Sequence, residues 1–144
     1  MKSATAYERN GKLFIFGQSK TIMGLWIEER PTLVIQKNEV AEIRKAVLNC
    51  LHLSKDGVPH PRQEDWPKLN KEFAESLGVK SFSAFAKTAR CVNISQDGGI
   101  IRLVPTQNRG SKIGFTPLED KSQTLRETDD GLGEAVIFAL SDSK

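Results

Sequence analysis

The sequence predicts an α+β fold, in which antiparallel sheet strands come from two ββββα halves joined by a helical pair. Apolar residues recur at the one-sided helical spacing i, i+3, i+4, i+7, i+8 in two segments: Ile43, Ala46, Val47, Cys50 and Leu51, then Leu132, Ala135, Val136, Ala139 and Leu140. Tight-turn sequences at 10–11 and 98–99 precede the two helices at a similar distance. We therefore interpret the halves as a pseudo-duplication.

Four strands are expected in the first half, at residues 4–9, 12–17, 25–27 and 32–36. Asn10-Gly11 supplies the two positive-φ positions of a type I′ hairpin turn. The continuous apolar run 13–16 predicts a strand that is covered on both faces. We expect a polar turn at 17–21, and Asn38 as the N-cap of the first helix.

The central segment predicts a loop followed by two helices. Glycine and proline mark residues 54–67 as a loop. A helical stripe comes next, formed by Trp66, Leu69, Phe73, Ala74 and Leu77. Pro67 suits the first turn of this helix and Gly78 the position after its end. Ser81 is expected to cap a short second helix over 82–89.

The second half repeats the strand pattern, with strands expected at 91–95, 100–104, 113–116 and 124–126. Residues 96–99 have the composition of a tight hairpin turn. Pro105 is expected to end its strand because proline has no N–H for the ladder. Thr128 is expected to cap the final helix, in which Gly131 and Gly133 would permit close backbone packing.

Length and composition favour one ordinary globular domain. At 144 residues the chain can bury its own core, so we expect a single domain over 1–144, with pseudo-repeats 1–54 and 90–144 and a helical insert 55–89. A net charge of +3, with the two signs interspersed, is too weak to imply a polyanionic partner. Cys50 and Cys91 occupy apolar positions and are expected to be reduced core thiols.

The same composition bears on location. No run of 18 apolar residues is present, and the first residues lack the apolar core of a secretion signal. We expect no association with a membrane and a cytoplasmic location.

Catalytic and metal-binding patterns are scarce. The chain has two histidines, and neither C-x-x-C nor H-E-x-x-H occurs. His60 with Glu64 and Asp65 is the one acid/base group that the loop could assemble, against the alternative of a solvated loop histidine. We expect neither catalytic residues nor a metal, a cofactor or a small-molecule ligand.

A nucleic-acid-binding module is a further alternative. Four basic residues could converge on one side of the second group of strands: Arg90, Arg102, Arg109 and Lys112. Phe115 is the one aromatic residue nearby that could stack on a base, and its position predicts a core residue. Nucleic acid is therefore not the expected partner.

The second half resembles bacterial contact-dependent growth inhibition (CDI) immunity proteins. The resemblance is carried by Leu77-Gly-Val-Lys-Ser-Phe82, Phe85-Ala-Lys-Thr-Ala-Arg-Cys-Val-Asn-Ile94, Ile100-Ile-Arg-Leu-Val-Pro105, Gly114-Phe-Thr-Pro117 and Leu132-Gly-Glu-Ala-Val136. The first half is similar in layout only. The resemblance implies a small cytoplasmic protein that binds a cognate toxin domain, often a nuclease, and blocks it by occlusion without chemistry of its own.

The expected contact residues follow from the general composition of protein interfaces. Aromatic and arginine anchors within a polar rim are typical of binding surfaces. In the loop before the central helix, Glu64, Asp65 and Trp66 fit this description, and a core position is the alternative for Trp66. Arg109 and Lys112 fit it too, in a polar loop expected over 106–112.

Overall fold

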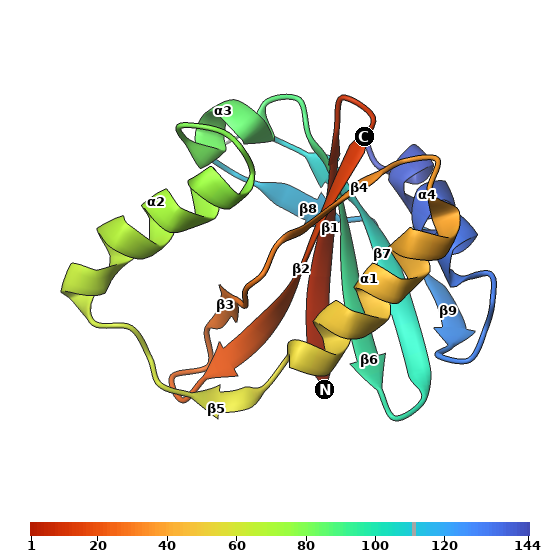
Figure 1. Ribbon diagram of the computed structural model, residues 1–144, viewed down its shortest axis with the longest axis horizontal. Coiled ribbons are helices and arrows are strands. Elements are labelled where there is room, and N and C mark those ends of the chain that lie inside the picture. Colours follow the sequence, from red (N-terminus) through yellow and green to blue (C-terminus); the bar gives the residue numbers. More distant parts are fainter. Residues whose placement is uncertain (111) are drawn as a thin grey trace.

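A single sheet forms the centre of the computed structural model, which describes residues 1–110 and 112–144 (Figure 1). The strands are β1 (Lys2–Arg9), β2 (Lys12–Thr21), β3 (Trp26–Glu28), β4 (Leu33–Gln36), β5 (Asp56–Val58), β6 (Arg90–Asp97), β7 (Ile100–Asn108), β8 (Phe115–Pro117) and β9 (Gln123–Arg126). The helices are α1 (Val40–Leu53), α2 (Trp66–Ser76), α3 (Phe82–Ala86) and α4 (Leu132–Asp142), with short 3₁₀ turns η1 (Gln63–Asp65) and η2 (Glu119–Lys121). Within this described part of the chain, no helix is long and apolar enough to cross a membrane.

The sheet order confirms the predicted α+β class and joins both halves of the chain. Across the described residues its nine strands follow the path β3-β2-β1-β6-β7-β8, with β4 and β5 also paired to β2 and β9 to β7. All pairs are antiparallel except β5 with β2. The halves meet where β1 pairs with β6, from Lys2 opposite Gln96 to Glu8 opposite Arg90. Each half supplies four of these strands and one helix. The origin of the halves by duplication and the predicted domain bounds both remain predictions.

One face of the sheet is covered by α1 and α4 (Figure 1). The two helical stripes predicted from the sequence are buried here, residue for residue. They pack on alternate strand residues, among them Ala4, Ala6, Leu13 and Ile15. Because side chains alternate across a strand, the intervening residues face the other way.

The opposite face carries an aromatic cluster beneath α2 and α3. Its members are Tyr7, Phe14, Phe16, Leu77, Phe85, Ala89 and Cys91, with Phe73, Val79, Phe82 and Phe115 at its edge. The apolar run 13–16 thus feeds both cores, as predicted, since Leu13 and Ile15 belong to the first and Phe14 and Phe16 to the second. The expected caps are confirmed for these helices: Ser81 accepts a hydrogen bond from the Ala84 N–H, and Gly78 has φ +74° after α2.

Three strand predictions were wrong. Residues 17–21 are not a turn, because β2 continues to Thr21 and its polar end pairs with β3 and β5. The 54–67 loop contributes β5 through that pairing. Pro105 does not end β7. Its carbonyl accepts from the Leu118 N–H on the outer side of the strand, so its missing N–H points to the same side. There the partner changes from β9 to β8, and no ladder bond is lost.

Helix beginnings were also predicted too early. α1 starts after Glu39 rather than at Asn38, because the Glu39 N–H first closes a turn onto the Gln36 carbonyl. α4 starts after Gly131 rather than at Thr128. There the Asp129 carboxylate accepts from the Gly131 N–H, and this local turn replaces the first helical turn. α3 ends at Ala86, three residues short of the expected end.

Candidate functional site

A polar hollow lies on the aromatic side of the sheet, beyond the cover of α2 and α3. Its volume is about 330 Å³, and its lining comes from six strands and η2: Ser3, Gln18, Trp26, Asn93, Ile94, Ser95, Arg102, Val104, Pro117 and Glu119. Gln18 accepts hydrogen bonds from the hydroxyl groups of Ser3 (2.9 Å) and Thr5 (3.0 Å). Arg102 forms an ion pair with Glu119 at the wall. The hollow therefore has a hydrogen-bonded, hydrophilic floor.

A second hollow continues the first beneath α2. It measures about 570 Å³ and is lined by Tyr7, Glu28, Asn70, Lys71, Phe73, Ala74, Lys80, Ser81 and Phe82. The two hollows are neighbours because Gln18 of one and Glu28 of the other are directly paired between β2 and β3. Burial, then the nearby Cys91 and Glu28, raise the pKa of Tyr7, so its hydroxyl keeps its proton. We call the two hollows together the open-face cleft.

An apolar turn lies between β2 and β3 and directly precedes Trp26 of the cleft lining. Ile22, Met23 and Leu25 are 71%, 73% and 44% exposed. The turn is nevertheless fixed, because the Thr21 hydroxyl accepts from the N–H groups of Met23 and Leu25. A rigid turn that presents large apolar side chains to solvent is typical of a contact surface for another protein.

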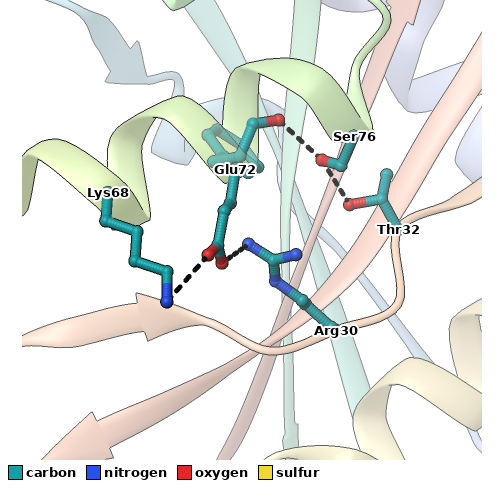
Figure 2. Close-up of polar contacts among 6 residues, drawn as sticks. Arg30, Thr32, Lys68, Glu72 and Ser76 are labelled. Atoms are coloured by element: carbon teal, nitrogen blue, oxygen red, sulfur yellow. Dashed lines mark hydrogen bonds and ion pairs between the residues drawn. The ribbon is translucent and has the colours of Figure 1, made fainter.

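Polar contacts from the β3–β4 connection hold α2 beside the cleft (Figure 2). Glu72 forms one ion pair with Arg30 of the connection and another with Lys68 of its own helix, the latter at 3.8 Å. One turn further along α2, the Thr32 hydroxyl donates to Ser76, which in turn donates to the Phe73 carbonyl. These contacts join α2 to the β3–β4 connection at this end of the cleft.

Comparison with known proteins identifies the family. A model of the family of CDI immunity proteins matches residues 34–143, from β4 through the end of α4. The chain belongs to this family. Among curated proteins, none matches the sequence significantly.

Two solved structures share the fold of this CDI immunity protein. A protein of unknown function from Neisseria meningitidis superposes with a TM-score of 0.79 at 16% identity, over 99% of this chain and 95% of that one. A chain of the CdiA-CT/CdiI toxin and immunity complex from Yersinia pseudotuberculosis gives a TM-score of 0.76 at 15% identity, over 99% and 97%. Nearly the whole length of the chain is thus covered by the shared fold.

The first group of predicted contact residues lies close to the apolar turn. His60 Nδ1 is 3.0 Å from the Thr21 hydroxyl, and the His60 ring meets the edge of Trp66 at 6.1 Å between centroids. Trp66 is half-buried, so it is neither fully core nor fully surface. Glu64 forms an ion pair with Arg62 (3.1 Å). These contacts attach the predicted contact segment to the turn.

Asp65 has a structural role as well. Hydrogen bonds from the Arg62 backbone and side chain lower the pKa of the Asp65 carboxyl group, so it stays ionised. Within the described residues, no hydrogen bond joins His60 to either carboxylate of the predicted acid/base group, because Arg62 engages both. The group is thus not assembled as an acid/base pair.

The second predicted group lies elsewhere. Arg109 and Lys112 are exposed in the β7–β8 connection, where Asn108 donates to the Ala86 carbonyl of α3. The Trp66 end of α2 is the end remote from α3, and a helix of 11 residues is about 16 Å long. The structure therefore does not bring the two predicted groups together.

Part of the predicted 106–112 loop is strand, since β7 runs to Asn108. Ser111 of this loop lies outside the described residues.

The proposed convergence of basic residues was wrong. Arg90 donates to the Leu140 carbonyl of α4 on the first face of the sheet. Arg102 lies on the second face, in the cleft, with Glu119 as its partner. The two side chains lie on opposite faces of the sheet, because successive residues of a strand alternate between its faces.

The cleft was missed from the sequence. Its polar residues are single side chains on separate strands, so no local spacing marks them. The apolar turn did carry a signal: Ile22 and Met23 stand before Gly24, where a surface turn between strands favours polar residues.

Proposed function

We propose that this CDI immunity protein binds the toxin domain of its own system in a one-to-one complex and neutralises it by occlusion. The match of the family model from β4 through the end of α4 carries the proposal. The Yersinia structure supports it, because a chain with this fold is found there in a toxin and immunity complex. We place this action in the cytoplasm, and the proposal assigns no catalytic step to the protein itself.

The open-face cleft and the apolar turn are the proposed contact surface. A concave polar floor beside exposed apolar anchors reproduces the usual division of an interface into anchors and polar rim. Glu64, Asp65 and Trp66 extend this surface along the start of α2 through the contact of His60 with Thr21. Arg109 and Lys112 form a separate proposed contact region on the β7–β8 connection.

The function is tested with the cognate toxin domain. The two proteins are co-purified, their affinity is measured by calorimetry, and toxin activity is followed with increasing amounts of this protein. We expect a stable complex and complete inhibition at one equivalent. A toxin that stays fully active with excess immunity protein, and no detectable complex, would refute the proposal.

Surface variants then distinguish the two contact regions. The pair Ile22→Ser and Met23→Ser should weaken toxin binding by about tenfold or more, since exposed apolar anchors carry much of the binding energy. Phe138→Ser, at an α4 residue that is 58% exposed, is the matched control and should leave affinity unchanged. Loss of binding in Arg109→Ala with Lys112→Ala, but not in the turn variants, would move the interface to the β7–β8 connection.

A further inference from the structure

We propose that the hollow beneath α2 is an anion subsite that receives one carboxylate side chain of the toxin domain. This inference rests on the proposed function and specifies the chemistry of the partner. The subsite consists of Tyr7, Lys71 and Lys80, with Asn70 and Ser81 beside them.

Unpartnered donors are the first argument. Tyr7 is 8% exposed, and within the described residues the structure records no hydrogen-bond partner for its hydroxyl group, although the side chain lines the hollow. Lys71 and Lys80 take part in none of the ion pairs formed between described residues. The Tyr7 hydroxyl is not among the fully buried, unpaired polar atoms of the described residues, so it opens into the hollow, and Lys71 and Lys80 are exposed. One hydroxyl donor and two ammonium groups therefore face one accessible space without an acceptor from the described residues, and an anionic side chain would find three donors there.

The charge balance selects a monovalent anion. Two lysines line the hollow with a single carboxylate, Glu28, so its lining carries one net positive charge. Glu28 is exposed and disfavours a doubly charged phosphate through repulsion. One carboxylate would neutralise the hollow and accept charge-assisted hydrogen bonds from both lysines and from Tyr7.

The shape of the hollow selects a side chain rather than a free ion. Its volume of about 570 Å³ is much larger than a bare ion requires. Phe73 and Phe82 form apolar walls that suit the methylene groups of an aspartate or glutamate. The adjoining polar hollow leaves room for the backbone that carries this side chain.

The test is the affinity of the toxin domain for matched variants. Lys71→Gln combined with Lys80→Gln should raise the Kd at least about tenfold, because a desolvated charge contact is lost. Tyr7→Phe, which removes the hydroxyl alone, should raise it about threefold to tenfold. Lys12→Gln combined with Lys87→Gln removes the same charge from exposed positions outside the cleft and should change the Kd less than about twofold. Thermal melting checks that each variant is folded.

The partner carboxylate is then located by replacing each aspartate and glutamate of the toxin with its amide. One of these changes should be non-additive with the double lysine variant, which shows that the two sites interact. If the unmodified proteins bind but the lysine variant binds equally well, or no toxin carboxylate couples to it, the subsite is refuted and the proposed function stands. If the unmodified proteins do not bind, the proposed function itself fails.

Discussion

Two glycines set the distances between the layers on the helical face. A Cβ atom at Gly17 would lie 2.4 Å from the Cys50 carbonyl oxygen of α1, and one at Gly133 would lie 2.3 Å from the Val40 carbonyl oxygen. Both obstacles are backbone atoms, which cannot move aside as a flexible side chain can. The close contacts of α1 with β2 and with α4 therefore require residues without side chains.

Substitution by alanine should consequently be costly at both sites. We expect Gly17→Ala and Gly133→Ala each to lower the free energy of unfolding by about 1–3 kcal/mol, as overpacking of a core does. Gly99→Ala is the matched control, because its nearest contact would be the Glu127 side chain at 3.9 Å, and it should change stability by less than about 0.5 kcal/mol. Urea unfolding measures all three, and equal effects would contradict the packing argument.

Three buried acidic groups give the protein a sensitivity to alkaline pH. Burial raises the pKa of the Cys50 thiol from 9.0 to about 11 and that of Cys91 to about 12, and it also raises the pKa of Tyr7. Both cysteines are free buried thiols, as predicted from their apolar positions. Between pH 9 and 11 the unfolded chain releases these protons while the folded chain keeps them, so stability must fall as pH rises.

Ionisation of these three groups should therefore lower the melting temperature progressively above about pH 9. Between pH 7 and 8 it should change the melting temperature little. Cys91→Ala removes one of the three groups, so its melting temperature should fall less steeply over the same interval. Scanning calorimetry at several pH values measures both slopes. Parallel slopes in the two proteins would show that Cys91 does not contribute.

At the scale of the elements, α2 is attached by aromatic packing more than by its ion pairs. Phe73 contacts Phe16 edge-to-face at 5.1 Å and Phe82 at 5.7 Å. The Arg30 and Glu72 side chains in Figure 2 are 55% and 31% exposed, and an ion pair so accessible to water stabilises a protein weakly.

Two substitutions on α2 separate these contributions. Glu72→Gln should lower the free energy of unfolding by less than about 1 kcal/mol. Phe73→Ala should lower it by about 2 kcal/mol or more, because the aromatic cluster loses a ring. Chemical denaturation provides the comparison, and a larger effect of Glu72→Gln would overturn the ranking.

The elements that the sequence predicted well are those with long periodic patterns. The buried stripes of α1 and α4 match the prediction because one face of each helix packs on a single surface. The ends of elements were predicted less well, since local turns at Glu39 and Asp129 compete with the capping geometry expected at Asn38 and Thr128. Pro105 was misjudged because its effect depends on which neighbouring strand it faces, and the sequence does not contain that information.

For the whole molecule, fold class and family were predictable, but the location of the cleft was not. The resemblance to the family was read from short segments between Leu77 and Val136, which a sequence displays directly. The family model then matches residues 34–143. The cleft depends on which strands are neighbours: Ser3, Gln18, Asn93 and Arg102 become adjacent only through the pairing of β2, β1, β6 and β7. Trp66 of the predicted contact residues lies near the apolar turn for the same kind of reason. It packs against His60, which is hydrogen-bonded to Thr21 at the end of β2.

The central pairing of β1 with β6 has a consequence for how the protein forms. It joins Lys2 to Gln96 across most of the chain, and the core beneath it takes side chains from both halves. Closing so long a loop is slow relative to forming local hairpins, so folding is expected on the millisecond-to-second scale typical of non-local sheets. The helices α1 and α4 also pack on each other, so this core is complete only when both halves are present. During synthesis on the ribosome, the chain therefore gains its native core only after the second half has emerged, and protection against a toxin begins with that event.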